Sequence, residues 1–276
     1  MNFQEQIRIH LGLYKSNVLG VVEKVIYNYK GKEHIYSHIL PTNKCKLNII
    51  DTYREQFFKS EYSKISYHRY FHHLNSSQAL CINFFFPFII ESNFKPILEL
   101  LALKDLEVSS SVFEYDSDVE VSNSRKTSFD FFIQLQGTKR VYVEVKYTEQ
   151  EFGRAKSDHS HKEKFIKTYL PLLENNIFIK DECKTESFFL KHYQIMRNLV
   201  HINEESIVVF LYPKANRKID SQAKLVYENV LTTKGKEKLK LLFLEDAVTR
   251  ILETVAQEKI NTYFREFKRK YLEYIK

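Results

Sequence analysis

The sequence has no tryptophan and few residues of the two types that make turns, with 6 glycines and 5 prolines in 276 positions. Glycine and proline together usually make up about 12% of a protein. Their scarcity excludes a collagen-like repeat and a glycine-rich linker, and it disfavours a β-sandwich with many tight turns. Because 43% of the residues are hydrophobic, the chain can bury a sizeable core, and wholesale disorder is excluded.

The three cysteines, Cys45, Cys81 and Cys183, lie far apart in the sequence. An odd and sparse set is typical of a reducing compartment and fits neither a disulfide framework nor a zinc ribbon. No stretch approaches the roughly 20 apolar residues of a membrane span, and the nearest, residues 79–90, is short and contains a proline. The first twenty residues lack the apolar core of a signal peptide. We therefore expect a cytoplasmic protein with no membrane segment.

Basic residues outnumber acidic ones, with 42 Lys and Arg against 35 Asp and Glu and a formal net charge of +7. Acidic residues nevertheless gather in residues 105–120, which contain no basic residue. A basic chain with a local acidic group suits a polyanionic partner together with a metal ion. Each charged run taken alone is more often a solvated surface, so the composition favours nucleic-acid binding without establishing it.

Two stretches alternate strictly between apolar and other residues, as β-strands do. Residues 128–135 place Phe129, Phe131, Ile133 and Leu135 on one side, and residues 140–147 place Val141, Val143 and Val145 on one side. The intervening 136–138 is a short loop that contains a glycine, so the pair predicts a β-hairpin.

The remaining elements are predicted from helical spacing, capping residues and apolar runs. Helices are expected at 49–75, at 78–86 after an N-cap at Ser76 or Ser77, and at 94–103, 162–173, 186–201, 221–231 and 245–276. Strands are expected at 111–115 and 207–212, Pro87 is expected to close or kink its helix, and residues 1–48 are expected to be largely irregular. This order describes an α/β protein with helical additions.

The predicted hairpin brings Asp130, Glu144 and Lys146 to one face. Glu144 and Lys146 are two residues apart on one strand, and a three-residue loop sets Asp130 directly opposite Glu144. A two-residue loop would instead send the two carboxylates to opposite faces. Since the other face of both strands is apolar, we expect that face to pack on the core and the charged face to stay polar.

Two carboxylates held together repel each other unless a cation lies between them. Mg²⁺ prefers oxygen ligands and usually takes one or two carboxylates together with phosphate oxygens and water. Asp130, Glu144 and the backbone carbonyl of Val145 can supply those ligands, and Lys146 can orient the attacking water and neutralise developing charge. This chemistry is hydrolysis of a phosphodiester. The alternative without a catalytic role is a solvated sheet face with one ion pair.

Asp130, followed after thirteen residues by Glu144-Val145-Lys146 on the next strand, resembles the PD-(D/E)XK nuclease superfamily. The segments 74–81, 145–149 and 193–198 look more closely like a bacterial family of restriction-endonuclease-like proteins within it, and the resemblance covers residues 50–215. It implies a restriction-endonuclease-like core, a central mixed sheet flanked by helices in the order α-β-β-β-α-β. The site departs from the family pattern in one place, because Phe129 stands where a proline is common.

The resemblance implies Asp130 and Glu144 as metal ligands and Lys146 as the catalytic lysine. Many members carry a further glutamate upstream, for which both Glu99 and Glu114 are candidates. Three other polar residues lie in the resembling segments and are candidates for supporting the site or contacting substrate: Gln78, Glu149 and Gln194.

We therefore read residues 1–276 as a single nuclease domain, with its core at about 94–215, an N-terminal helical region at about 1–93 and a C-terminal helical extension at about 216–276. The expected activity is Mg²⁺-dependent hydrolysis of DNA, with Mn²⁺ as a substitute, by a restriction-type endonuclease. Two alternatives stay open, a nucleic-acid-binding protein that has lost catalysis and a nuclease for RNA or structured ends. A homodimer would explain cleavage of both strands, although no sequence feature requires one.

Overall fold

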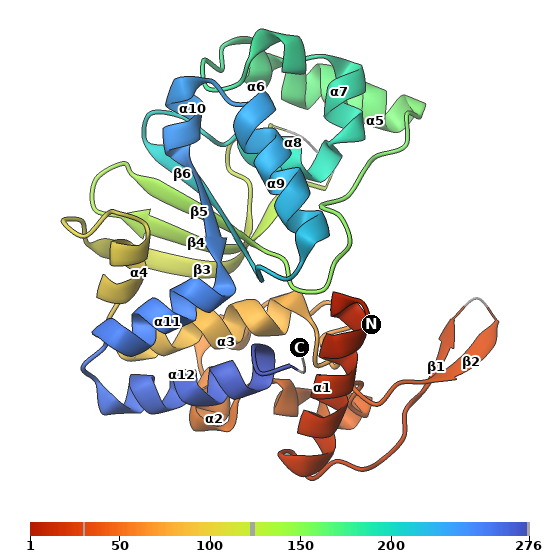
Figure 1. The fold of residues 1–276 in the computed structure, drawn as a ribbon. Helices are drawn as coiled ribbons and strands as arrows, with labels where there is room; N and C mark the ends of the chain where they lie inside the picture. Colours follow the sequence, from red (N-terminus) through yellow and green to blue (C-terminus); the bar gives the residue numbers. More distant parts are fainter. Residues whose placement is uncertain (30, 122–124, 275–276) are drawn as a thin grey trace. The chain divides into compact units, whose positions relative to one another are not determined.

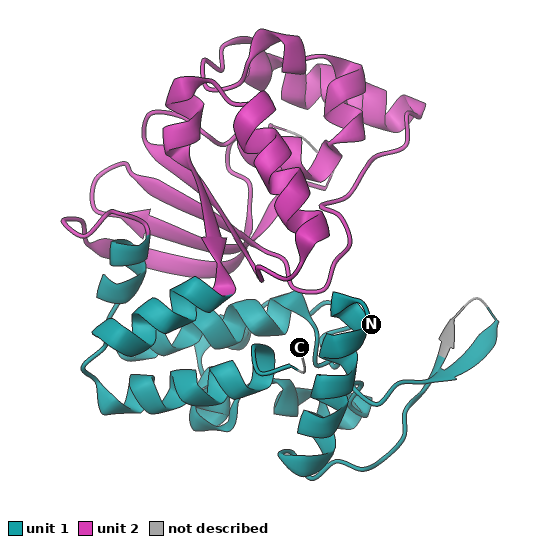
Figure 2. Ribbon diagram, in the orientation of Figure 1, with its two compact units in different colours: residues 1–100, 245–276 teal, residues 101–244 magenta. Residues whose placement is uncertain are grey.

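The computed structural model describes residues 1–29, 31–121 and 125–274. The chain divides into two compact units, one formed by residues 1–100 and 245–276 and the other by residues 101–244 (Figure 2). Within the described residues, no helix is long and apolar enough to cross a membrane. The two units are described in turn because each has its own elements and core.

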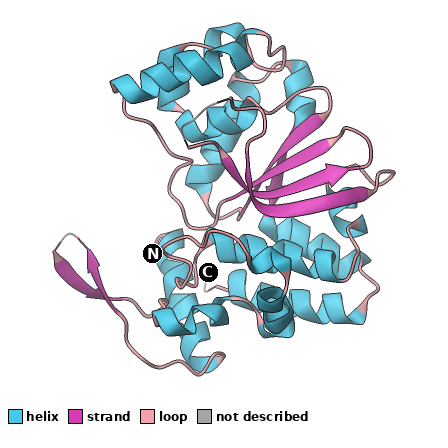
Figure 3. Ribbon diagram, turned by 180° about the vertical axis from the view of Figure 1, so that it is seen from behind, coloured by secondary structure: helices cyan, strands magenta, loops and turns pink. Residues whose placement is uncertain are grey.

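The unit of residues 101–244 contains one five-stranded sheet with the order β3-β4-β5-β6-β7 (Figures 1 and 3). Its strands are β3 (Val108–Asp116), β4 (Ser128–Leu135), β5 (Arg140–Val145), β6 (Ser206–Tyr212) and β7 (Leu239–Phe243). The first three pair antiparallel, and β5, β6 and β7 pair parallel. The sheet is therefore mixed, as predicted, and β7 is an addition that the sequence pattern did not reveal.

Helices pack on one face of this sheet. They are α5 (His159–Lys164), a π-helical turn (Phe165–Tyr169), α6 (Leu170–Glu174), a 3₁₀ turn (Asp181–Cys183), α7 (Glu186–Lys191), α8 (Tyr193–Leu199), α9 (Arg217–Asn229) and α10 (Thr233–Lys238). Sheet residues Phe132, Tyr142 and Phe210 form a buried cluster with helix residues such as Phe189 and Met196. The chain order of helix, three strands, helices and strand matches the predicted α-β-β-β-α-β core.

The other unit is mainly helical and is built from both ends of the chain. Its elements are α1 (Phe3–Asn17), strands β1 (Ile26–Tyr29) and β2 (Lys32–Ile35), 3₁₀ turns (Thr42–Asn48 and Glu61–Ser63), α2 (Asp51–Lys59), α3 (Ser77–Ile90), α4 (Lys95–Leu100), α11 (Leu244–Thr254) and α12 (Glu258–Tyr271). Helix α1 begins with a capping box, in which Asn2 accepts from the Glu5 N–H and Glu5 accepts from the Asn2 N–H. The expectation that residues 1–48 are largely irregular is therefore wrong for this helix.

Helix α3 begins at its predicted N-cap, where the Ser76 hydroxyl accepts a hydrogen bond from the Ala79 N–H. The expectation that Pro87 closes the helix is wrong, because α3 continues to Ile90. A proline cannot donate to the carbonyl four residues earlier. Here that carbonyl, on Asn83, accepts a hydrogen bond from the Tyr263 hydroxyl at 2.7 Å instead. The helix continues because α12 supplies the missing donor.

Three long helices of the sequence prediction are broken in the structure. The predicted helix 186–201 is divided into α7 and α8 at His192, and the other two breaks involve polar side chains. The stretch 49–75 forms α2 only to Lys59, and the Ser60 hydroxyl donates to the Phe57 carbonyl at the helix end. The stretch 245–276 is divided into α11 and α12, and the Asn261 side chain donates to the Leu252 carbonyl near the break. Its last two positions, 275–276, lie outside the described residues. In both cases polar side chains satisfy carbonyls at a helix end.

Candidate active site

The register of the β4–β5 hairpin brings the predicted carboxylates together. Phe131 pairs with Val143 and Gln134 with Arg140. Directly beyond Phe131, the Asp130 side chain accepts from the Val145 N–H, and Asp130 lies close enough to Glu144 for their charges to interact. The loop comprises residues 136–138 because the Leu135 N–H donates to the Lys139 carbonyl across it. Gly137 in this loop has φ +77°, a conformation that favours glycine. The predicted three-residue loop and the register that depends on it are confirmed.

Glu144 is held by two hydrogen-bond donors. Its Oε1 lies 2.8 Å from the Lys146 ammonium and 2.8 Å from the Gln194 side-chain amide, which donates to it from α8. Glu144 is only 3% exposed and Lys146 8%. A buried carboxylate with two donors on one oxygen has a restricted orientation. Gln194, a candidate from the sequence, therefore contacts Glu144 directly. We call Asp130, Glu144 and Lys146 the acidic centre.

Asp130 lies on the adjacent strand and bonds to the residue between the other two. Its Oδ2 accepts a hydrogen bond of 2.7 Å from the Val145 backbone N–H. Burial raises the pKa of the Asp130 carboxyl well above its usual value, and the charges of Glu144 and Glu114 raise it further. Lys146 and the hydrogen bond from Val145 oppose this shift. Asp130 is therefore surrounded by two further carboxylates and one ammonium, an arrangement that favours its protonated form when no other cation is bound.

The Lys146 ammonium stays positively charged at this position. Burial alone would lower its pKa, but the carboxylates of Glu144, Glu149 and Asp130 outweigh burial and raise the pKa above its usual value. The Phe152 ring adds a cation–π contact, with its centroid 5.6 Å from the ammonium nitrogen. Lys146 can therefore act as a fixed cation and hydrogen-bond donor, and it is not a proton acceptor at neutral pH.

Of the two upstream glutamates, Glu114 is the one beside Asp130. It lies on β3 between the pairs Phe113 with Phe131 and Tyr115 with Phe129, so the register places it opposite Asp130. Its φ is +53°, a left-handed conformation that costs a non-glycine residue about 1–3 kcal/mol. Such strain concentrates at functional sites. Glu99 lies on α4, in the other unit.

The charged face of the hairpin is not the open polar face that we expected. Glu144 shares its face of β5 with Tyr142, which belongs to the buried cluster under the helices. Phe129 belongs to the same cluster, so it does not lie on the side of Phe131 as the alternation predicted. The opposite face is buried as well, since Val141 and Val143 are at most 1% exposed. Side chains on both faces of β5 are therefore largely buried. The acidic centre is thus a polar site set into an otherwise apolar face.

The chain beyond β5 is anchored on both sides. The Lys146 N–H donates to the Leu211 carbonyl of β6, and the Glu149 side chain accepts from the Tyr147 N–H at 2.6 Å. The Asn216 amide donates to the carbonyls of Tyr147 and Glu149 at 3.0 and 2.9 Å. Sequence reasoning missed Asn216, although an asparagine directly before a helical pattern is an N-cap signal, and its side chain does cap α9.

Gln78, the remaining candidate, makes its described hydrogen bonds within its own unit. It lies in α3, in the helical unit, and is 1% exposed. Its Oε1 accepts from the His68 N–H and its amide donates to the Ser66 carbonyl, at 2.9 and 3.0 Å. These bonds hold the segment that precedes α3, which is a structural role for a residue that the sequence left open.

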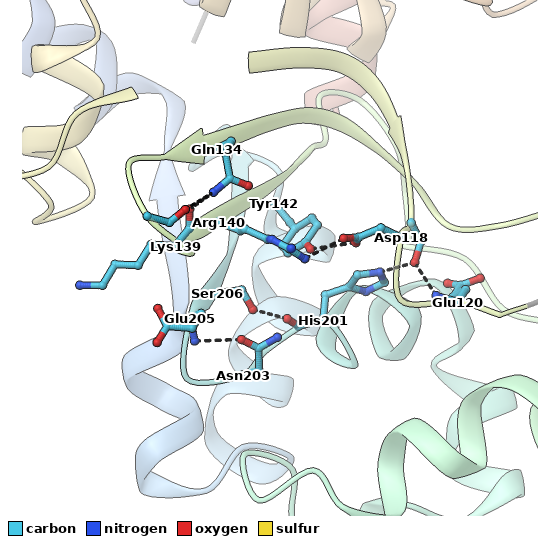
Figure 4. A network of polar contacts seen from close by, with 12 residues as sticks. Asp118, Glu120, Gln134, Lys139, Arg140, Tyr142, His201, Asn203, Glu205 and Ser206 are labelled. Atoms are coloured by element: carbon cyan, nitrogen blue, oxygen red, sulfur yellow. Dashed lines mark hydrogen bonds and ion pairs between the residues drawn. The ribbon is translucent and has the colours of Figure 1, made fainter. Parts of the chain in front are cut away.

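A second polar network lies at the opposite end of β5 (Figure 4). Arg140 pairs with Asp118 at 2.6 Å, and the Tyr142 hydroxyl donates to the same carboxylate. His201 bonds to the Ser117 hydroxyl at 2.7 Å, and burial lowers the pKa of His201 to about 4. The histidine is therefore neutral at physiological pH. This network ties the segment after β3 to β5 and to the end of α8.

Within the described part of the chain, no group of three or more acidic, histidine or cysteine side chains is spaced to hold a metal by itself. The oxygen donors at the centre are nevertheless those that Mg²⁺ prefers. Burial and the neighbouring charges of Glu144 and Glu114 raise the pKa of Asp130, and a bound cation would oppose both effects. Asp130 and Glu144 therefore fit a cation that draws its remaining ligands from elsewhere.

The mixed five-stranded sheet flanked by helices is the architecture of the restriction-endonuclease-like class of nuclease folds. A family model described as Restriction Endonuclease associating with ARP matches residues 8–272, and the chain belongs to that family. Membership implies a nuclease, with DNA as its partner. Comparisons with curated proteins and with solved structures find no match. The resemblance recognised in the sequence is thus confirmed at the level of the family.

Proposed function

We propose that this protein is a metal-dependent nuclease of the PD-(D/E)XK type that hydrolyses DNA phosphodiester bonds as a restriction-type endonuclease. The observation that carries the proposal is the proximity of Asp130, bonded to the Val145 N–H, to Glu144, whose Oε1 lies 2.8 Å from the Lys146 ammonium. Two carboxylates and one cation at a single point of a nuclease-family fold are what this reaction needs. Cytoplasmic location and a homodimer remain predictions.

Asp130 and Glu144 would hold the metal, with Mg²⁺ as the expected ion and Mn²⁺ as a substitute, and the Val145 carbonyl is the proposed third protein ligand. When bound, such an ion lowers the pKa of a coordinated water and stabilises charge on the phosphate. Mg²⁺ commonly takes only one or two carboxylates and completes its shell with water and substrate phosphate. The protein donors at this centre are consistent with that mode of binding.

The side chains themselves would perform three tasks. Lys146, kept cationic by its carboxylate neighbours, would orient the attacking water and neutralise charge that develops on the phosphate. Gln194 would keep Glu144 in position through its hydrogen bond. The Val145 N–H would fix Asp130, so that both carboxylates are oriented before substrate arrives.

The experiment that tests the proposal is cleavage of labelled duplex DNA, single-stranded DNA and RNA by the purified chain with Mg²⁺, Mn²⁺ or EDTA. We expect metal-dependent cleavage of duplex DNA. Retention of DNA at low salt without cleavage in either metal would favour a nucleic-acid-binding protein that has lost catalysis. Preferential cleavage of RNA or of duplex ends would favour a nuclease for RNA or structured ends.

Replacing Gln194 by alanine is expected to lower the cleavage rate by about 10–100-fold, the usual cost of losing a residue that orients a metal ligand. The loss follows because Glu144 keeps only Lys146 as a donor on Oε1. The measurement is the rate as a function of Mg²⁺ concentration. A positioning role predicts that more Mg²⁺ is needed for half-maximal rate, whereas the control Gln136→Ala in the exposed hairpin loop should leave the curve unchanged.

Replacing Glu114 by glutamine is expected to move Mg²⁺ binding to lower pH. Glu114 raises the pKa of Asp130, and a carboxylate must be deprotonated to bind metal. Removing its charge therefore lets Asp130 ionise at lower pH. The measurement is thermal stabilisation by Mg²⁺ across pH 5–8, with Glu99→Gln as the matched control. An equal shift in both variants would contradict the assignment of Glu114 to the centre.

A further inference from the structure

A small cavity lies in the same unit as the acidic centre, with a volume of about 90 Å³. It is lined by Glu151, Phe152, Gly153, Arg154, Lys191, His192, Ile195 and Gln222. Pockets for drug-sized ligands usually measure about 300–1,000 Å³. Since a water molecule takes about 30 Å³ of liquid volume, this cavity admits only a small group.

Two contacts connect the cavity to the reaction centre. Phe152, one of its walls, lies with its ring centroid 5.6 Å from the Lys146 ammonium. Gly153, another wall, packs against Gln194, because a Cβ placed on this glycine would lie 3.1 Å from the Gln194 Oε1. Gln194 in turn bonds to Glu144. The cavity is therefore one side chain away from Lys146 and one from Glu144.

Two features favour glycine at position 153. Its φ of +118° is a conformation that side-chain-bearing residues rarely adopt, and a Cβ would lie 3.1 Å from the Gln194 Oε1, closer than an ordinary contact. The Gly153 carbonyl accepts from the Gln194 N–H at 3.3 Å, which joins the loop after β5 to the start of α8. The same glycine thus brings the cavity wall and the residue that holds Glu144 into contact.

The charged groups around the cavity are mainly cationic. Arg154 pairs with Glu151 at 3.1 Å, while Lys191 and His192 have no carboxylate partner within the described part of the chain. Burial lowers the pKa of His192, and the positive charges of Lys191 and Arg154 lower it further. One carboxylate therefore faces two permanent cations and an imidazole, so the cavity favours an anion.

We propose that this cavity, bordered by Arg154, Lys191 and His192, binds a backbone phosphate of the nucleic-acid strand next to the phosphate that is hydrolysed at Asp130, Glu144 and Lys146. The inference rests on the proposed nuclease function and adds to it a second point of substrate contact. A phosphate fits the size and the charge of the cavity. Two adjacent phosphates held at two points would fix the strand along its direction, and such contacts position the substrate without reading its sequence.

The test measures the salt dependence of DNA binding in EDTA, with the double variant Arg154→Gln/Lys191→Gln in the full chain. Each phosphate contact contributes about −0.9 to the slope of log K against log salt on duplex DNA. We expect the slope to become shallower by roughly 1 and the affinity at low salt to fall. Because Arg154 and Lys191 are exposed, the variant should fold, and its melting temperature checks this.

The matched control is Lys139→Gln. Lys139 is exposed and precedes β5, whereas Lys146 follows it, so the two lie about 20 Å apart along a strand of this length. The parent slope should be retained in this variant. If both variants lose slope equally, or if neither does, the cavity is not a phosphate site even when the parent protein cuts DNA. If the parent neither binds nor cuts nucleic acid, the proposed function fails and this inference with it.

A second readout locates the phosphate. A set of duplexes that each carry one uncharged methylphosphonate is bound to the parent and to the double variant. We expect one position beside the cleaved bond where neutralisation weakens the parent severalfold but leaves the double variant unaffected. Equal weakening of both proteins at every position would overturn the proposal.

Discussion

Replacing Lys146 by glutamine is expected to abolish cleavage, with a loss of about 10²–10³-fold or more, while the fold and most DNA binding are retained. The ammonium is buried and cationic beside Glu144, so its removal takes away positive charge where negative charge develops in the transition state. Glutamine is preferred to alanine because it can still donate to Glu144, and removing one partner of a buried ion pair is strongly destabilising.

The measurement combines single-turnover cleavage with DNA-binding titrations and thermal melting. Lys139→Gln is the matched control, since it removes the same charge from the exposed other end of β5. Binding within a few-fold of the parent together with lost cleavage supports a role in the chemical step. Full activity of Lys146→Gln would remove Lys146 from the proposed centre, and loss of binding equal to the loss of cleavage would make it a substrate-binding residue instead.

The Asp130→Asn variant is expected to be more stable than the parent in EDTA and to gain almost nothing from Mg²⁺. The Asp130 pKa is raised in the folded protein by burial, Glu144 and Glu114. The folded state therefore binds more protons than the unfolded state between the two pKa values, and the stability of the metal-free protein falls as pH rises through that window. Asparagine removes this cost because it is neutral and can still accept from the Val145 N–H.

In the parent, Mg²⁺ at about 100 times its Kd would stabilise the fold by about 2.7 kcal/mol, or roughly 5–10 °C for a unit of this size. The measurement is melting temperature against pH, with and without Mg²⁺. The parent should become less stable with rising pH in EDTA and should regain stability with Mg²⁺, whereas Asp130→Asn should show neither change. A parent that gains nothing from Mg²⁺ at any pH would exclude Asp130 as a ligand of a stably bound ion.

The centre of the fold could be predicted because its signals are local. The two alternating strands and the glycine-containing loop set the hairpin register, and that register brings Asp130 next to Glu144 and Val145. A shift of one residue would have separated them. The prediction therefore depended on one loop length, and the structure has that length.

Other parts depend on distant contacts that a sequence pattern does not contain. Strand β7 is short and pairs with β6 in parallel, so it is not preceded by a hairpin turn that would reveal it in the sequence. Helix α3 continues past Pro87 only because Tyr263, far along the chain, donates to the freed carbonyl. The charged face was expected to be solvated because burial on both sides of a sheet is a property of the whole fold.

The same distinction applies within the site. Gln194 and Glu149 were recognised as candidates without roles, and the structure gives them contacts with Glu144 and with the Tyr147 N–H. The choice between Glu99 and Glu114 depended on the register of β3, in which Glu114 has a left-handed backbone conformation. Neither strain nor register at that position can be read from the residue type.

The most direct test of the central claim is conversion of supercoiled plasmid by the parent protein and by Lys146→Gln, each with Mg²⁺ and with EDTA. The proposed centre predicts nicked or linear plasmid only for the parent and only with the metal. Cleavage that persists in EDTA, or that is equally fast in Lys146→Gln, would contradict a metal-dependent centre at Asp130, Glu144 and Lys146.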